Sequence, residues 1–202
     1  IATALYFRLV PDPRRPELLS ALVRTLEENG YRQTTGEVCF RMLVQTLADA
    51  GRSDVVLRML SREDAPGYGY MLKLGFKTLS ETWDGPGSSM NHCMFGHARE
   101  WFQKSIVGIQ QAPGSVGFQK IRLSPEPVGD LTSAAGHYDS VYGRIESAWQ
   151  IEGDRFRWQV VVPPNTSAAV HIPAQRVEDV TESGVPLAQA AHMTSALVPW
   201  RQ

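Results

Sequence analysis

The hydrophobic pattern of this chain changes period once, close to Pro113 and Gly114. Before this point apolar residues recur every three or four positions, as a buried helix face requires; Leu19, Leu22, Val23 and Leu26 are one such set. From residue 118 onward apolar and polar residues alternate, as they do in half-buried strands. The pattern therefore predicts an α+β chain in two parts, with helices in residues 1–112 and strands in residues 113–202.

Gly- and Pro-marked turns divide each part into short elements. In the first part we expect helices over residues 1–9, 16–29, 37–50 and 53–60, and a long helix that ends near Gly108 and whose inner face runs through Phe95, Ala98, Phe102, Ser105 and Ile109. Short turns between helices favour antiparallel hairpins. In the second part we expect strands over residues 121–123, 141–149, 155–162, 168–172 and 176–180. Several short strands at this spacing are typical of an antiparallel β-sandwich.

Composition excludes several classes of partner. The formal charge is −1, from 20 basic and 21 acidic residues, so we expect neither a nucleic-acid partner nor a membrane partner. No stretch approaches the roughly 20 apolar residues of a membrane span, and we expect a soluble protein; whether it is cytoplasmic, periplasmic or secreted stays open. Cys39 and Cys93 lie in apolar runs, which favours reduced, buried thiols over a disulfide.

The chain starts in the middle of an amphipathic pattern, with no initiator Met and no capping residue before Ile1. We therefore expect a fragment of a longer polypeptide, whose native start would lie elsewhere.

One stretch, residues 66–96, carries most of the chemistry. It combines five glycines before residue 90 with several aromatic residues, two acids (Glu81 and Asp84) and His92. It holds too many helix breakers for a helix and too many large side chains for a solvated linker. Long ordered loops of this kind are usually functional, so we interpret residues 66–96 as a site loop.

The composition of the site loop narrows its chemistry. It has no phosphate-binding glycine motif, and the spacing of His92 and His97 lacks the glutamate of a zinc-protease helix, so we expect no cofactor and no metal. A carboxylate among aromatic rings remains, and this is the composition of a sugar site: Glu81, Trp83, Tyr68, Tyr70 and Phe76. Each residue also has a plainer reading, as an exposed acid, a packing aromatic or a surface histidine. The residues alone leave both readings open.

The chain also resembles a known family along nearly its whole length. The motifs are Gly67-Tyr68-Gly69-Tyr70-Met71-Leu72, Glu81-Thr82-Trp83, Ser89-Met90-Asn91-His92-Cys93-Met94-Phe95-Gly96, Leu47-Ala48-Asp49-Ala50-Gly51-Arg52 and, in the β part, Val162-Pro163-Pro164-Asn165-Thr166. Together they resemble the C-terminal portion of bacterial α-L-rhamnosidases, which are inverting glycoside hydrolases. One departure is Gly75-Phe76-Lys77, where typical members have Ala-Thr after the glycine.

The resemblance implies a fold and a set of roles. The fold would be the last helices of an (α/α)6 six-hairpin toroid followed by a C-terminal β-sandwich. Glu81 would be the general base, His92 would bind a rhamnose hydroxyl, and Trp83, Tyr68 and Tyr70 would line the pocket. The general acid would lie in the preceding part of the same polypeptide. Glu37, in Thr35-Gly36-Glu37, could face the same cavity, but nothing assigns the acid role to it. The partner would be a rhamnose-containing substrate, and this chain alone would be inactive.

Two alternatives remain at this stage. The chain could be a non-catalytic carbohydrate-binding or structural fragment, or it could derive from another six-hairpin glycosidase with a different sugar preference. Apolar helix faces of an incomplete toroid could also associate, so a homo-oligomer is among the expectations.

Overall fold

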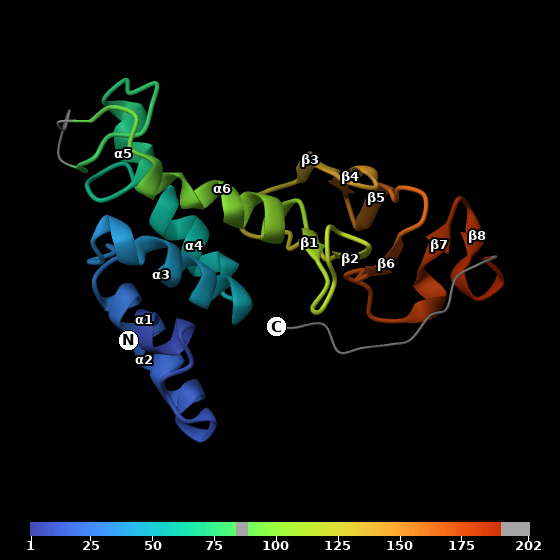
Figure 1. Cartoon of the computed structure of the whole chain (residues 1–202), viewed down its shortest axis with the longest axis horizontal. Helices are drawn as coiled ribbons and strands as arrows, with labels where there is room; N and C mark the ends of the chain where they lie inside the picture. The colour runs from blue at the N-terminus through green and yellow to red at the C-terminus, as the bar shows by residue number, and fades with distance from the viewer. Residues whose placement is uncertain (84–88, 191–202) are drawn as a thin grey trace.

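The computed structural model describes residues 1–83 and 89–190. Its helices gather at one end and its strands at the other, and α6 leads from the first group to the second (Figure 1). None of the described helices is long and apolar enough to cross a membrane. The two-part α+β fold expected from the change of period is confirmed.

The helical part contains six α-helices in the described residues, together with short 3-10 and π-helical segments. They are α1 (Ala2–Tyr6), α2 (Arg15–Glu28), α3 (Glu37–Asp49), α4 (Ser53–Leu60), α5 (Tyr68–Lys73) and α6 (Ala98–Trp101). Short 3-10 segments cover Asp12–Arg14 and Cys93–His97, and a π-helical turn covers Phe102–Ile106. The expected helices at 1–9, 16–29, 37–50 and 53–60 correspond to α1 to α4. Helix α2 has a proline in its first turn and is followed by Gly30 at φ +61°, as its sequence predicts.

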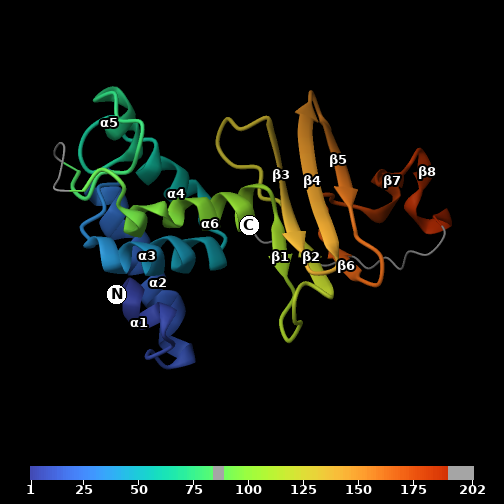
Figure 2. The same ribbon diagram turned by 45° about the horizontal axis from the view of Figure 1, so that its top comes forward.

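Helix α3 is the centre of this part, because it contacts α1, α4 and α6 (Figure 2). Its inner face is almost fully buried: Phe40, Leu43, Val44 and Leu47 are each at most 1% exposed. Val55, Val56 and Met59 of α4 complete the same core. The site loop therefore rests on a rigid scaffold.

Several expectations about the helical part were wrong. The long helix before Gly108 is three short segments of different pitch, so a single 3.6-residue period does not hold across it. Trp101 is consequently fully buried, whereas Phe102 is 47% exposed and Ile109 belongs to a strand. Cys93, expected to be buried, is exposed.

The site loop was expected to contain no helix, but it includes α5. The glycines do not break this helix; they let it approach the end of α4. A Cβ atom on Gly69 would lie 2.6 Å from the carbonyl oxygen of Arg62, and the backbone N–H of Tyr70 donates to that same oxygen at 2.8 Å. Close approach of two backbones is the usual reason for glycine at such positions.

The β part holds eight described strands. One sheet has the order β1-β2-β6, from Ile109–Gln111, Lys120–Leu123 and Ser167–Val170; a second has the order β3-β4-β5, from Ser133–Ser140, Gly143–Glu152 and Arg155–Val161; and β7 (Thr181–Glu182) pairs with β8 (Val185–Pro186). All pairs are antiparallel except β2 with β6, which run parallel. Strand β1 lies before residue 112 but pairs with β2, which lies after it. The division of the chain into domains at residue 112 therefore stays a prediction.

Four of the five expected strands correspond to β2, β4, β5 and β6. The expected strand at 176–180 was wrong: Val177–Asp179 forms a 3-10 turn, which the contact between the Arg176 guanidinium and the Asp179 carboxylate closes at 3.1 Å. Strands β1 and β3 were not expected. The sequence of β3, SAAGHYDS, has no alternation of large apolar residues, so only its pairing with β4 shows it to be a strand.

Indole and hydroxyl groups join the helical part to the β part. The indole N–H of Trp149, on β4, donates to the carbonyl of Ile106 at 2.7 Å, and the hydroxyl of Ser147 donates to the carbonyl of Val107 at 2.6 Å. The indole N–H of Trp101 donates to Ser53 at 3.0 Å, and the Ser53 hydroxyl donates in turn to the carboxylate of Glu126. Ser53 thus links α4, the end of α6 and the segment after β2.

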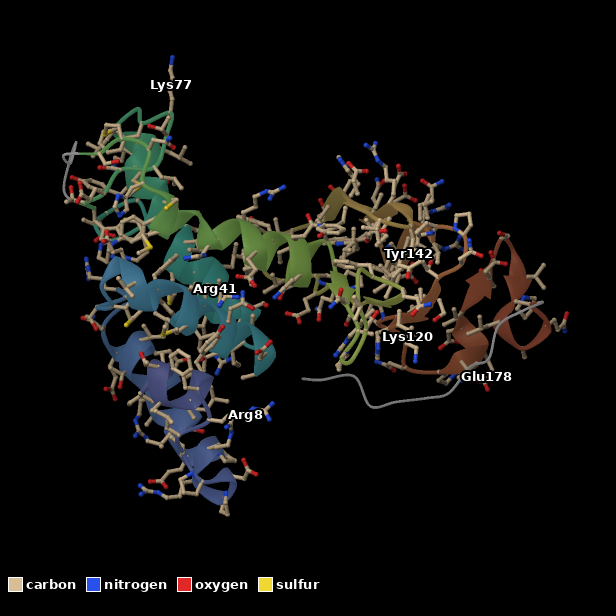
Figure 3. The ribbon with its side chains drawn as sticks, viewed as in Figure 1. Arg8, Arg41, Lys77, Lys120, Tyr142 and Glu178 are labelled. Carbon is tan, nitrogen blue, oxygen red and sulfur yellow. The ribbon has the colours of Figure 1, made fainter. Side chains whose placement is uncertain are left out.

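An ion cluster fixes α6 on α3. Arg41, on α3 (Figure 3), donates to both carboxylate oxygens of Glu100 at 2.7 and 2.9 Å, and Lys104 donates to Glu100 at 2.6 Å. Burial opposes ionisation of Glu100, but the hydrogen bonds from Arg41 and Lys104 outweigh it and lower the pKa of the carboxyl to about 2. Stability from this cluster is therefore present above the ordinary glutamate pKa and is lost as the pH falls toward 2.

Replacement of Ser53 tests the connection between the two parts. In Ser53→Ala the buried indole N–H of Trp101 loses its acceptor, so we expect the free energy of unfolding to fall by about 1–3 kcal/mol. Urea unfolding measures this change. The control is Ser20→Ala, at an exposed position on α2, where we expect a change within about 0.5 kcal/mol. Equal losses in the two variants would contradict the connecting role of Ser53.

Candidate active site

The site loop lies over the beginning of α3, at the end of the helical part away from the strands (Figure 1). An aromatic cluster holds it there. Phe40 of α3 contacts Tyr68, Trp83 and Phe95 at ring centroid distances of 6.0, 6.1 and 5.8 Å, and Trp83 lies 4.3 Å from Phe95. These three loop aromatics come from the start, the middle and the end of the loop. One contact region on α3 therefore fixes the described parts of the loop at three points.

Two of the aromatics expected at the sugar pocket belong to this cluster. Tyr68 lies 5.4 Å from Trp83 between ring centroids, and its hydroxyl donates to the carbonyl of Phe95. Burial raises the pKa of the Tyr68 hydroxyl well above its ordinary value. Tyr70 lies on α5 and is half-buried. Whether Tyr68, Tyr70 and Trp83 also touch a ligand stays a prediction.

Lys77 follows the glycine turn at which this chain departs from typical relatives. It is exposed and points away from the body of the molecule (Figure 3), whereas the neighbouring Phe76 packs on the helical core. The departure at Phe76 and Lys77 thus places one ring inside and one charge outside.

Glu81 and His92 lie on two loop segments that pair through their backbones. The backbone N–H of Glu81 donates to the carbonyl of Ser89 at 2.9 Å, and the backbone N–H of His92 donates to the carbonyl of Leu79 at 2.9 Å. The Glu81 carboxylate accepts a further hydrogen bond, from the backbone N–H of Ser89, at 3.0 Å. The carboxylate is half-buried and fixed in orientation. Asp84, the other acid expected in the loop, lies outside the described residues.

The structure adds Glu37 to this group. Glu37 is the first residue of α3, and its Oε2 atom lies 2.8 Å from Nε2 of His92. The two atoms are in ion-pair contact, but the ring N–H is not aligned for a regular hydrogen bond, because Nε2 is among the buried atoms that have no such partner. That Glu37 could face the site cavity was expected, but its contact with His92 was not predicted from the sequence.

Metal binding has no geometric support in the part of the chain that the structure describes. No three His, Cys, Asp or Glu side chains gather there as a metal site would need. His97 lies in the last turn of the 3-10 segment that begins at Cys93, directly before α6.

Comparison with known families covers most of the chain. Residues 1–106 match the family described as the bacterial alpha-L-rhamnosidase 6 hairpin glycosidase domain. The chain belongs to the bacterial α-L-rhamnosidases. Residues 108–185 match the C-terminal domain of the same enzymes, so the match continues through most of the β part.

Individual rhamnosidases agree with this assignment. The chain is 33% identical to the α-L-rhamnosidase of Streptomyces avermitilis over 87% of its own length and 18% of that enzyme, and 29% identical to one from Formosa agariphila over 88% of its length and 20% of the enzyme. It superposes on the rhamnosidase structure from Dictyoglumus thermophilum with a TM-score of 0.84 and 30% identity, covering 94% of this chain and 22% of that one. The chain thus spans about a fifth of the length of these rhamnosidases.

A second structure bears on the sugar. The S. avermitilis rhamnosidase, solved in complex with L-rhamnose, superposes with a TM-score of 0.81 and 31% identity over 91% of this chain and 19% of that one. The family, the two-part fold and the relation to a longer enzyme, all expected from the motifs, are confirmed.

Alkaline titration tests the burial of Tyr68. The unfolded chain releases the tyrosine proton near the ordinary pKa of about 10, whereas the folded loop retains it, so folding stability should fall as the pH rises above about 10. In Tyr68→Phe this part of the fall should disappear, although the variant starts about 1 kcal/mol lower because it lacks the bond to Phe95. Urea unfolding at several pH values between about 8 and 11 measures both slopes. Identical slopes would contradict the assignment.

Proposed function

We propose that this chain supplies the last helices of the catalytic domain and the following β domain of an inverting α-L-rhamnosidase. The observation that carries the proposal is the placement of Glu81 and His92 on two paired segments of the site loop over the start of α3, in a chain whose fold matches rhamnosidases. The parent enzyme would release terminal L-rhamnose from glycosides. Residues 1–112 and 113–202 would be its two domains within this chain.

Glu81 would act as the general base. Its carboxylate would take a proton from water while the water oxygen attacks the anomeric carbon, and the glycosidic bond would break as a general acid protonates the departing oxygen. Inversion requires about 6.5–9.5 Å between the two carboxyl groups, which leaves room for that water. The hydrogen bond from the Ser89 backbone holds one oxygen of Glu81, at 3.0 Å, and leaves the orientation of the carboxylate defined before substrate binds.

His92 would hydrogen-bond a hydroxyl of the sugar, and Tyr70 would offer an aromatic surface to the apolar side of rhamnose, which carries a methyl group. Trp83 and Tyr68 would line the base of the same pocket through the ring faces that the cluster leaves accessible. Both are only half-buried, so part of each side chain lies at the surface of the loop.

The general acid would come from a part of the parent polypeptide outside this chain. An apolar groove on the helical part supports this proposal, because it offers a surface on which such a part would pack. The groove has a volume of about 720 Å³ and is lined by α4, α5, α6 and the π turn, including Leu57, Leu60, Leu72, Ala98 and Phe102. Leu72 is 72% exposed and Phe102 is 47% exposed. A six-hairpin domain requires more helices than the ones described here, and we propose that a further helical hairpin of that domain fills the groove.

Replacement of Glu81 tests the catalytic role. In the parent enzyme, Glu81→Gln keeps the shape of the side chain but cannot accept a proton, so kcat for an aryl α-L-rhamnoside should fall by about two to four orders of magnitude, with rhamnose binding largely retained. Glu178→Gln is the control, since Glu178 is exposed on the β part and lies 3.9 Å from Arg176. A near-normal rate in Glu81→Gln would remove Glu81 as the base. Aryl glucosides, mannosides and fucosides in the same assay test the sugar preference.

The groove is tested by comparing one substitution in two lengths of chain. Leu72→Ser should cost the 202-residue chain little, because Leu72 is exposed there, but should destabilise the parent enzyme by about 1.5–3 kcal/mol if a hairpin buries it. Val116→Ser, on the β part and 81% exposed, is the matched control. Thermal unfolding of all variants gives the comparison. Equal effects of Leu72→Ser in both lengths would show that the groove stays open to solvent.

A further inference from the structure

The two ring nitrogens of His92 have different surroundings. Nε2 is buried and lies 2.8 Å from a carboxylate oxygen of Glu37. No hydrogen bond in the described part of the chain involves Nδ1, and Nδ1 is not among its buried unpaired atoms, so solvent can reach this nitrogen. The imidazole therefore has an inner edge that faces Glu37 and an outer edge that is available to a ligand.

Both partners are held in place by elements that cannot move independently. Glu37 follows Gly36, which is extended at φ −66° and ψ 164° and begins α3, so its backbone position is set by the helix start. Three residues later, Phe40 anchors α3 in the aromatic cluster and is 1% exposed. His92 is fixed by its backbone bond to Leu79 at 2.9 Å, and its ring centroid lies 6.4 Å from that of Phe95. Helix α3 and the site loop therefore hold the side chains of Glu37 and His92 close together.

A carboxylate beside one nitrogen of a histidine determines where the proton sits. In a neutral imidazole one nitrogen carries the proton and the other accepts hydrogen bonds, and an adjacent carboxylate favours the proton on the nitrogen it faces. Carboxylates fix the tautomer and the ring orientation of metal-binding histidines in the same way. The electrostatic preference does not require an aligned hydrogen bond, because at 2.8 Å in a half-buried site the attraction is strong.

We propose that Glu37 is a positioning residue for His92: its carboxylate keeps the proton on Nε2 and leaves Nδ1, at the open edge of the ring, as a hydrogen-bond acceptor for a hydroxyl of the sugar. This inference deepens the proposed function and rests on it for the identity of the ligand. It also gives Glu37 a task other than proton donation to the leaving group.

The tautomer of His92 can be observed directly, without a ligand. Two-bond proton–nitrogen NMR spectra of the 202-residue chain in mildly alkaline buffer report which ring nitrogen carries the proton, and His92→Gln assigns the signal among the five histidines. We expect the wild-type chain to show mainly the Nε2–H form. Glu37→Leu, which removes the acceptor, should bring the two tautomers toward equal populations. Glu37→Gln, whose amide oxygen can still face Nε2, should largely restore the wild-type spectrum.

Glu17→Leu is the matched control, because Glu17 also lies in the first turn of a helix but is exposed and faces Arg14, at 3.8 Å, instead of a histidine. It should lower helix stability as much as Glu37→Leu does without changing the His92 spectrum. A tautomer ratio that is the same in the wild-type chain and in Glu37→Leu overturns the proposal.

Titration with L-rhamnose then separates this inference from the proposed function. In the parent enzyme, which holds the rest of the site, Glu37→Leu should raise the Kd of L-rhamnose about tenfold, the loss expected for one misaligned hydrogen bond. Calorimetry measures both affinities, and equal values overturn the positioning role in binding. A tautomer that responds to Glu37 in the 202-residue chain, together with a rhamnose affinity that His92→Gln leaves unchanged in the parent enzyme, supports the positioning role and removes His92 from the sugar site.

Discussion

The contact of three loop rings with Phe40 is the constraint on which the candidate site depends. Ordering a loop as long as residues 66–96 costs about 1–2 kcal/mol per residue in backbone entropy, far more than a few hydrogen bonds near its tip can return. Burial of Tyr68, Trp83 and Phe95 against Phe40 provides apolar contact at three separate points along the loop. The backbone bonds that pair Glu81 with Ser89 and His92 with Leu79 therefore form within an already restricted chain.

The β part takes part in this arrangement although it lies at the opposite end. The segment from Cys93 to Ile106 starts at the site loop and ends where Trp149 and Ser147 of β4 donate hydrogen bonds to the carbonyls of Ile106 and Val107. The ion cluster of Glu100 fixes the middle of the same segment on α3. A displacement of the β part would therefore act on the far end of the segment from Cys93 to Ile106, which directly follows His92. This coupling gives a physical reason for the match of both domains in one chain.

The sequence predicts those features that local pattern determines. Helix α2 has a proline at its start and a glycine at its end, β5 alternates clearly and β4 more weakly, and all three were expected at about the right positions. Phe102 was misplaced because a 3-10 segment and a π turn interrupt the helical period on either side of α6, and β3 was missed because its residues are small or polar. The contact of Glu37 with His92 joins two segments far apart in the sequence, and only the tertiary fold brings them together.

Tertiary contacts also change how the aromatic residues of the motif are understood. An aromatic-rich loop with a carboxylate indicates a sugar site, but the structure uses the donor of Tyr68 and much of the Trp83 ring to hold the loop on α3. Under the proposed function, Glu81 and His92 would then discriminate among the hydroxyls of the sugar, and the rest of the toroid would add apolar contacts to those of Tyr70, Trp83 and Tyr68. A chain that spans about a fifth of its relatives would hold the base and one polar contact of such a site, and the rest of the toroid would supply the acid and the larger part of the binding energy.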